Sequence, residues 1–291
     1  MKRTITNPYL TVQIEEKGAQ LYSVQDKAGH EYLWQGDPNY WTGRAPNLFP
    51  YIARLTEGKY TLNGKTYDMG IHGFAKNIVF DTEQVSESKI VFSTQDTDET
   101  RAQYPYAFAF SVIYALEEDQ LSVTYDVKNK DDERMYFGVG AHPGFCVPME
   151  SGLDFTDYYL EFHEIAPAKR VGFSEDCFLN GNDTPFIMED GLKLPLHHDM
   201  FDDDAIVLVD MAKAVTLKSD KGNRSVRVEY PDMEYLGFWH KPKTDAPYVC
   251  IEPWSSLPSR KNVIEDFATQ PSLLSLEAGA EYQNQIVIII E

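Results

Sequence analysis

The sequence predicts an all-β protein in which antiparallel sheets stack into one large β-sandwich with few short helices. Runs that alternate apolar and polar residues, rich in Val, Ile, Tyr, Phe and Thr, cover the 291-residue chain from end to end. Turn signals such as "LNGK", "KNKDD" and "SDKGN" separate many of these runs at intervals typical of hairpins. Strand patterns do not alternate with helical ones, which argues against a parallel α/β sheet.

In chain order, each predicted strand is a run with the strand period of two. The runs are 9–16, 20–26, 89–95, 108–116, 120–129, 134–141, 205–210, 214–220, 225–230, 235–239, 248–254 and 285–290. Helical patterns are scarce, and we expect a short helix only within 262–275, where Pro271 would end it. Because no linker, composition shift or repeat divides the chain, residues 1–291 are predicted to form a single domain.

Charge narrows the classes of partner. The chain carries 46 acidic and 26 basic residues, for a formal net charge of −20. Nucleic acids and anionic membranes bind to basic patches, so the composition argues against both. A solvated acidic surface is the simplest reading of this charge. It also disfavours a heavily phosphorylated substrate, unless a local pair of arginines overrides the overall field.

Cysteine usage and apolar runs predict a cytoplasmic location. Cys146, Cys177 and Cys250 are far apart and form no CxxC, so they suggest neither a disulfide framework nor a zinc knuckle. The N-terminal segment lacks the apolar region of a signal peptide. The longest apolar run, "IVIII", is too short to span a bilayer.

The stretch "GVGAHPGFCVP" places His142 on the same predicted strand face as Gly138 and Gly140. Glycine within a strand often marks a close approach of a ligand or of another backbone. We therefore interpret the two glycines as clearance for a ligand beside His142. The alternative is a packed, hydrogen-bonded core histidine.

The stretch "YVCIEPWSSLPSR" places Glu252 in an apolar strand, on one face with Tyr248, Cys250 and Trp254. A carboxylate is rare in such a strand unless it is paired or functional. The alternative to a functional role is a structural ion pair with an arginine. An indole such as Trp254 beside a carboxylate suits a sugar, whose C–H faces pack on aromatic rings while its hydroxyls bind carboxylates.

Other polar residues give weaker signals. Arg54 lies in the apolar run "APNLFPYIARL", and His72 precedes a glycine in "DMGIHGFAKN". His197, His198 and Asp199 lack the spacing of a metal site, and Asp202–Asp204 resemble a solvated acidic turn more than a calcium loop. Signatures of nucleotide binding, of a serine nucleophile and of kinases are missing. General acid–base chemistry by a His–Glu pair, without cofactor or metal, is then the most economical prediction.

Five motifs in order, "NLFPYIARL", "HGFAKN", "GVGAHPGF", "FDDDAIVL" and "CIEPW", resemble those of the aldose 1-epimerase (galactose mutarotase-like) family, in particular its divergent small bacterial members. The resemblance implies a β-supersandwich with a sugar in an open cleft. It makes His142 the general acid and Glu252 the general base, with Arg54 and His72 holding the sugar hydroxyls and ring oxygen. The cleft aspartate of the family falls on Asp202 or Asp204. The neighbours in "AHPGF" and "IEPW" differ from those of better-known mutarotases, so sugar preference does not carry over.

The expected function is interconversion of the α- and β-anomers of a free hexose by a monomer or homodimer. One alternative keeps the reaction with a hexose 6-phosphate, for which Arg44, Arg54 and Lys76 are the nearest basic residues by motif. Another is a non-catalytic carbohydrate-binding protein on the same fold. A glycosidase fits less well, because it usually needs two carboxylates that flank the bond.

Overall fold

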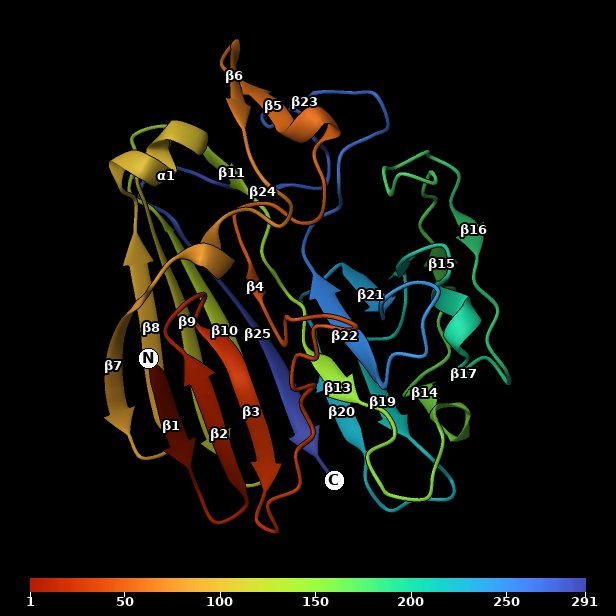
Figure 1. Cartoon of the computed structure of the whole chain (residues 1–291). Helices are drawn as coiled ribbons and strands as arrows, with labels where there is room; N and C mark the ends of the chain where they lie inside the picture. Colours follow the sequence, from red (N-terminus) through yellow and green to blue (C-terminus); the bar gives the residue numbers. More distant parts are fainter.

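The computed structural model describes residues 1–291 and consists mainly of antiparallel strands in two layers (Figure 1). One layer is a nine-stranded sheet, ordered β17-β14-β19-β20-β25-β10-β9-β8-β7. Its long central strands pair with uninterrupted register: β9 and β10 form a hairpin, and β25, from the far end of the sequence, pairs with the other edge of β10. The bounds are β7 Asp81–Ser86, β8 Lys89–Gln95, β9 Phe108–Glu117, β10 Gln120–Asn129, β14 Tyr159–Phe162, β17 Lys193–Pro195, β19 Ala214–Lys218, β20 Val226–Glu229 and β25 Glu281–Ile290.

The second layer holds an eight-stranded sheet and a three-stranded one. The eight-stranded sheet is ordered β16-β15-β18-β21-β22-β12-β4, and β13 also pairs with β22. Its strands are β4 Asn47–Leu48, β12 Gly140–Ala141, β13 Gly144–Cys146, β15 Lys169–Arg170, β16 Thr184–Pro185, β18 Ile206–Val209, β21 Tyr235–Trp239 and β22 Tyr248–Trp254. The three-stranded sheet contains β1 Lys2–Thr6, β2 Leu10–Glu15 and β3 Gln20–Asp26.

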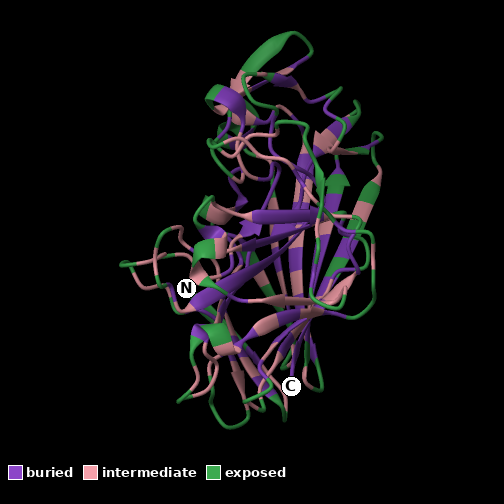
Figure 2. Cartoon of the chain, turned by 90° about the vertical axis from the view of Figure 1, so that its right-hand side faces the viewer, coloured by how far each residue is buried: buried purple, intermediate pink, exposed green.

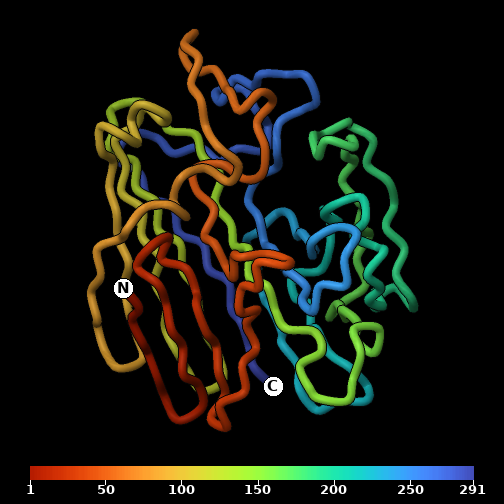
Figure 3. Tube along the Cα trace, viewed as in Figure 1, coloured from red at the N-terminus to blue at the C-terminus, as the bar shows by residue number.

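Shorter elements gather at one end of the sandwich, at the top of Figure 3. There β23 pairs in parallel with β5, which brings chain segments about 200 residues apart side by side. The elements are β5 Lys59–Leu62, β6 Lys65–Asp68, β23 Glu265–Asp266, β11 Met135–Phe137, β24 Leu274–Leu276 and the helix α1 Asp98–Gln103. The chain also has four 3₁₀ turns: η1 Thr56–Gly58, which directly precedes β5, η2 Ala75–Asn77, η3 Phe155–Asp157 and η4 His198–Phe201.

The hydrophobic core lies between the two layers. One cluster of 65 buried residues takes side chains from both, among them Val12 of β2, Phe110 of β9 and Ile251 of β22. Burial follows the strand period: β9 alternates buried and half-buried residues along nine positions. Figure 2 shows the buried residues along the strands and the exposed ones at turns and edges. The all-β sandwich predicted from the sequence is confirmed.

Two local predictions are wrong. Segment 262–275 contains turns and the short strands β23 and β24 rather than a helix. The predicted strand 134–141 is split into β11 and β12, which join different sheets. The break occurs because Gly138 N–H donates to the Pro50 carbonyl and Val139 N–H donates to Ser255 Oγ.

Helix α1 was not predicted. Its N-terminal signal is short: Thr97 Oγ accepts from Thr100 N–H, Thr100 Oγ accepts from Thr97 N–H, and two acidic residues follow Thr97. Six residues are too few for an apolar period to show in the sequence. None of the helices is long and apolar enough to cross a membrane.

Candidate active site

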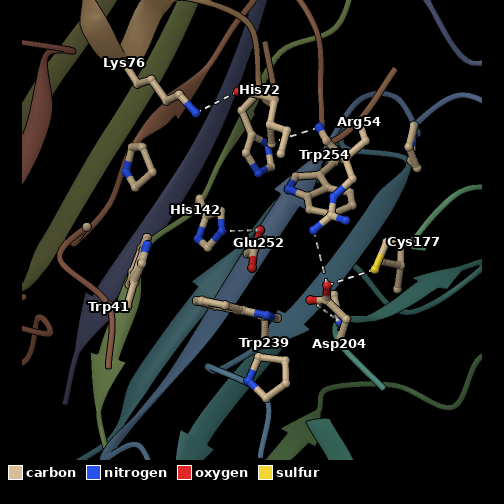
Figure 4. A pocket seen from close by; sticks show the side chains of 18 of the residues that line it. Trp41, Arg54, His72, Lys76, His142, Cys177, Asp204, Trp239, Glu252 and Trp254 are labelled. Carbon is tan, nitrogen blue, oxygen red and sulfur yellow. Dashed lines mark hydrogen bonds and ion pairs between the residues drawn. The ribbon is translucent and has the colours of Figure 1, made fainter. Parts of the chain in front are cut away.

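A cleft of about 700 Å³ opens over the eight-stranded sheet and is lined by residues from β21, β22 and the loops above them (Figure 4). Strand β22 contributes Glu252 and Trp254, and β21 contributes Trp239. Loops contribute Arg54, His72, Lys76, His142, Cys177 and Asp204. Of the seven site residues predicted from the sequence, six line this cleft; the seventh, Asp202, does not.

Strand register places His142 against Glu252. Gly140 of β12 pairs with Trp254 of β22, and Gly144 of β13 pairs with Cys250 of β22. His142 is midway between the two glycines and therefore lies opposite Glu252. The distance from His142 Nε2 to Glu252 Oε2 is 3.3 Å. Both side chains are buried, 10% and 2% exposed, at the floor of the cleft. The sequence predicted the two residue types but gave no evidence that they meet.

The face alternation predicted for β22 is also observed. Val249 and Ile251 pack into the main core between the layers. Tyr248 and Cys250 pack into a small cluster on the cleft side, where Glu252 and Trp254 line the cleft. Because the backbone pairs on both edges, with β21 and with β12 and β13, Glu252 is carried by a strand that cannot shift easily.

The interpretation of Gly138 and Gly140 as clearance for a ligand is wrong. A Cβ on Gly138 would lie 2.1 Å from Ser256 Oγ. A Cβ on Gly140 would lie 2.9 Å from the Pro253 carbonyl oxygen and 3.0 Å from the Trp254 ring. The space beside both glycines is therefore filled by the C-terminal end of β22 and by Ser256, which follows it. The glycines allow His142 to reach Glu252 by letting two backbones approach closely.

Burial acts on both members of the pair in the direction of the neutral form. It lowers the pKa of His142 to about 3; the residue's own backbone opposes this effect and the charge of Lys76 adds to it. Burial raises the pKa of Glu252 well above its ordinary value, Asp204 raises it further, and Trp254 lowers it. His142 Nδ1 and Glu252 Oε2 are buried and lack hydrogen-bond partners within the chain.

His72 is held by a loop in the left-handed backbone region, with φ of 63°. The ring Nδ1 of His72 accepts from the backbone N–H of Ala53 at 3.1 Å, and the backbone N–H of His72 donates to the Ala53 carbonyl at 2.9 Å. A ring nitrogen that accepts carries no proton, so Nε2 is the donor of the neutral ring. Burial, followed by His142 and the cations Lys76 and Arg54, lowers the pKa of His72 well below its ordinary value. His72 is thus a neutral donor in the cleft.

Arg54, Asp204 and Cys177 form a polar cluster at the rim. An Arg54 nitrogen lies 3.7 Å from Asp204 Oδ2, and Cys177 Sγ donates to the same oxygen at 2.9 Å. Burial and the neighbouring Asp204 raise the pKa of Cys177 to about 12, which keeps it a thiol donor. The choice between Asp202 and Asp204 is resolved by position. Asp202 is exposed outside the cleft, and its Oδ1 accepts from Lys243 N–H at 3.1 Å.

Aromatic rings that the sequence analysis did not single out enclose His142. Trp41 stacks on its ring at 4.9 Å, and Trp239 meets it edge-on at 5.7 Å. Trp239 ends the predicted strand 235–239, and its cleft position follows from pairing with Cys250. Trp41 lies in an irregular segment where no period exists to reveal it; Trp34 Nε1–H donates to its carbonyl. These indoles, with Trp254, give the cleft apolar walls beside its polar floor.

The remaining candidates lie elsewhere or have structural partners. Arg44 is outside the cleft, where it covers the Tyr22 ring at 3.6 Å. Lys76 lines the cleft and donates to the Ile71 carbonyl at 2.7 Å. His198 forms a 3.1 Å hydrogen-bond contact with His240 in place of a metal cluster with His197 and Asp199. A group with metal-ligand spacing is His142, Cys250 and Glu252.

Comparison with known proteins agrees with the fold. A family model described as aldose 1-epimerase matches residues 1–288. "Protein LacX, chromosomal" of Lactococcus lactis subsp. lactis is 35% identical over 287 residues, 94% of this chain and 95% of that protein. A crystal structure of a "galactose mutarotase related enzyme" from Lactobacillus acidophilus is 34% identical with a TM-score of 0.96, covering 100% of this chain and 97% of that one. A "galactose mutarotase-like protein" from Lactobacillus casei is 33% identical with a TM-score of 0.95, covering all of both chains.

Proposed function

Because this chain belongs to the aldose 1-epimerase family, we propose that it interconverts the α- and β-anomers of a free hexose by general acid–base catalysis. The observation that carries the proposal is the contact between His142 and Glu252 at the floor of the cleft, 3.3 Å apart and buried. A proton acceptor and a proton donor are the two groups that the reaction requires.

The chemistry assigns one proton transfer to each residue. Glu252 takes the proton from the C1 hydroxyl while His142 gives a proton to the ring oxygen, and the C1–O5 bond breaks. The open-chain aldehyde rotates about C1–C2. Closure on the other face of the carbonyl then returns both protons in reverse, so the enzyme ends as it began. No electrons leave the sugar, and no covalent intermediate is needed.

The side-by-side placement of the pair suits this reaction. The two groups lie next to each other at the floor of the cleft. The hydroxyl oxygen and the ring oxygen are both bonded to C1, so one pair of neighbouring groups can serve them together. The rings of Trp41 and Trp239 limit where a hexose can enter and direct its C1 end to the floor.

Burial favours a neutral pair, with the carboxyl protonated and the imidazole neutral. This is the proton arrangement after the ring has opened, since Glu252 has gained a proton and His142 has lost one. The ring-closed sugar requires the charged arrangement, which hydrogen bonds from the bound hydroxyls would support. In both arrangements the pair holds one proton, so the same site serves both directions.

The loop residues supply the binding groups. The Nε2–H of His72 donates to a sugar oxygen, and the guanidinium of Arg54 and the carboxylate of Asp204 bind hydroxyls at the rim. A free hexose fits this rim better than a hexose 6-phosphate. Arg44 is outside the cleft, Lys76 is engaged by a carbonyl, and Arg54 is opposed by Asp204 with Asp203 nearby. A phosphate beside Arg54 would meet the negative charges of both Asp203 and Asp204.

We keep the cytoplasm as the proposed location. Cys146, Cys177 and Cys250 are free thiols in the structure. Free thiols are typical of a reducing compartment such as the cytoplasm.

The test measures anomer exchange by NMR on glucose, galactose and their 6-phosphates in parallel. We expect exchange well above the buffer rate with at least one free hexose and slower exchange with the phosphates. Faster turnover of a phosphorylated sugar would replace the proposed substrate class. Calorimetric binding of a hexose without any accelerated exchange would instead favour a carbohydrate-binding protein.

A further inference from the structure

Behind the residues that line the cleft floor lies a third side chain, fully buried, that the proposed reaction does not use. Cys250 precedes Glu252 by two residues on β22, so both side chains lie on the same face of the strand. A ligand atom of His142, the Sγ of Cys250 and a carboxylate oxygen of Glu252 all lie within 4.8 Å of one another. The three residues are 8%, 0% and 1% exposed.

An independent observation points to a missing partner at this cluster. Glu252 Oε2 is buried and has no hydrogen-bond partner. Buried polar atoms are nearly always partnered by protein or by a bound species. The contact from Oε2 to His142 Nε2, at 3.3 Å, lies within ion-pair distance but does not satisfy the geometry of a hydrogen bond.

We propose that His142, Cys250 and Glu252 form a binding site for a thiophilic divalent cation such as Zn²⁺, and that the bound ion blocks the sugar. Imidazole, thiolate and carboxylate are the three ligand types that zinc takes in proteins. Hard cations such as Mg²⁺ and Ca²⁺ prefer sites made of oxygens alone, so the buried sulfur selects against them.

The geometry requires only a small contraction. Zinc–ligand distances of about 2.0–2.3 Å place the donors of one ion about 3.3–3.8 Å apart. The cluster lies within 4.8 Å, so rotations of the His142 and Glu252 side chains can close it around an ion. Three protein ligands leave a fourth position, which faces the cleft. Coordination releases the thiol proton and the one proton shared by the His142–Glu252 pair to the solvent, and it forms the bonds from the metal to sulfur, nitrogen and oxygen without any redox change.

The ion would act as an inhibitor. It occupies the Nε2 lone pair of His142 and the carboxylate of Glu252, the two groups that move protons in the proposed reaction. Ion binding itself does not depend on that reaction, whereas inhibition rests on the proposed function. The two parts are therefore measured separately.

The binding test uses the full chain after chelation, with Zn²⁺ titrated by calorimetry and no sugar present. We expect one ion per chain, and at least about tenfold weaker binding for Cys250→Ala and Cys250→Ser, because one of three ligands is lost. Cys146→Ala and Cys177→Ala are the matched thiol controls and should bind as the parent does. Equal affinity in parent and Cys250→Ala, or weakening in the Cys177 control instead, would overturn the proposal.

Two further measurements complete the test. The first needs no variant, so it applies even if Cys250→Ala fails to fold, and the second measures inhibition of the proposed reaction. Co²⁺ bound to the unmodified chain should show a thiolate-to-metal absorption band; a spectrum without that band would exclude Cys250 as a ligand. Anomer exchange should be lost in Zn²⁺, return with a chelator, and persist in Cys250→Ala at the same Zn²⁺ concentration. Exchange that continues while Zn²⁺ is bound would refute the blocking role alone.

Discussion

His142 and Glu252 stand on or between paired strands, whereas Arg54, His72 and Asp204 stand on loops. We call these the strand half and the loop half of the site. In the strand half the side chains are at most 10% exposed. In the loop half the Arg54 and Asp204 side chains are 40% and 30% exposed. In the proposed reaction, the proton-transfer groups therefore lie in the buried half, and the groups assigned to sugar binding lie in the open half.

The backbones of the halves differ as well. Ala53, His72, Cys177 and Asp204 all have positive φ, from 59° to 75°. Such conformations cost about 1–3 kcal/mol for a side-chain-bearing residue and persist where the surroundings hold them. His142 and Glu252 need no such strain, because strand register alone brings them together. The difference suggests that the strand half fixes reacting atoms and the loop half tolerates adjustment to the sugar.

The largest expected effect separates chemistry from binding. In His142→Asn or Glu252→Gln, kcat for anomer exchange should fall by about 10²–10⁴-fold, the usual contribution of a positioned proton-transfer group. KM should change little. The double variant should lose far less than the product of the single effects, since the two residues act as a unit. NMR exchange measurements over a range of sugar concentrations give both constants.

Two results would contradict the assignment of proton transfer to the strand half. Variants that equilibrate the sugar as fast as the parent would remove the pair from the mechanism. A rise in KM at constant kcat would instead make the strand half a binding surface. Circular dichroism of each variant checks that the fold is intact.

The second effect belongs to the loop half. Asp204→Asn should raise KM by about tenfold, since a hydrogen bond to a charged group is worth about 1.5–3 kcal/mol. Its effect on kcat should be smaller. Asp202→Asn is the matched control, because Asp202 is exposed outside the cleft, and it should stay within about twofold of the parent. If the two variants behave alike, the assignment of Asp204 to the sugar is wrong.

The same division explains what the sequence could predict. Strand period placed Val249 and Ile251 in the core and Glu252 on the other face, as observed. Register is set by pairing between distant segments, so the 3.3 Å contact of His142 with Glu252 was not visible in either motif. The two glycines were misread because the neighbour over them, Ser256 with Trp254, belongs to another part of the chain.

In the loop half the residue types came from a family resemblance, and physical reasoning added little. A loop has no period, so nothing in "FDDDAIVL" says which aspartate faces the cleft. Trp41 was missed for the same reason. Its place depends on the bond from Trp34 to its carbonyl and on the ring of His142, both contacts between segments that only the folded chain brings together.

A third test concerns how burial acts on the strand half. Burial raises the pKa of the Glu252 carboxyl above 4.5, its value in the unfolded chain. At pH values between 4.5 and the raised pKa, the carboxyl is therefore protonated in the folded chain and ionised in the unfolded chain. The unfolding free energy should therefore fall as pH rises through that window. Glu252→Gln removes the dependence. Its stability in urea should exceed that of the parent by more than about 1 kcal/mol near pH 8, with the gap closing toward pH 4.5.

Glu265 offers a matched control of opposite sign. It is also buried, 3% exposed, but Arg260 donates to both of its carboxylate oxygens. Burial acts to raise its pKa, and the Arg260 bonds outweigh burial and lower it. Glu265→Gln should lose stability at neutral pH, with the loss shrinking on acidification. The same pH dependence for both variants would contradict an unpaired Glu252.

The smallest effect probes backbone strain directly. Ala53→Gly should stabilise the chain by about 0.5–1 kcal/mol, because glycine adopts positive φ without the cost that a Cβ carries, partly offset by greater freedom when unfolded. Ala141→Gly is the control in the strand half. Ala141 lies in β12 and is 4% exposed, so the change should destabilise by about 1–2 kcal/mol through lost burial and added backbone entropy. Urea unfolding of both variants measures the two changes in unfolding free energy, which should have opposite signs. Destabilisation at both positions would mean that the hydrogen bonds between Ala53 and His72 hold a relaxed loop, and that the two halves differ in exposure but not in strain.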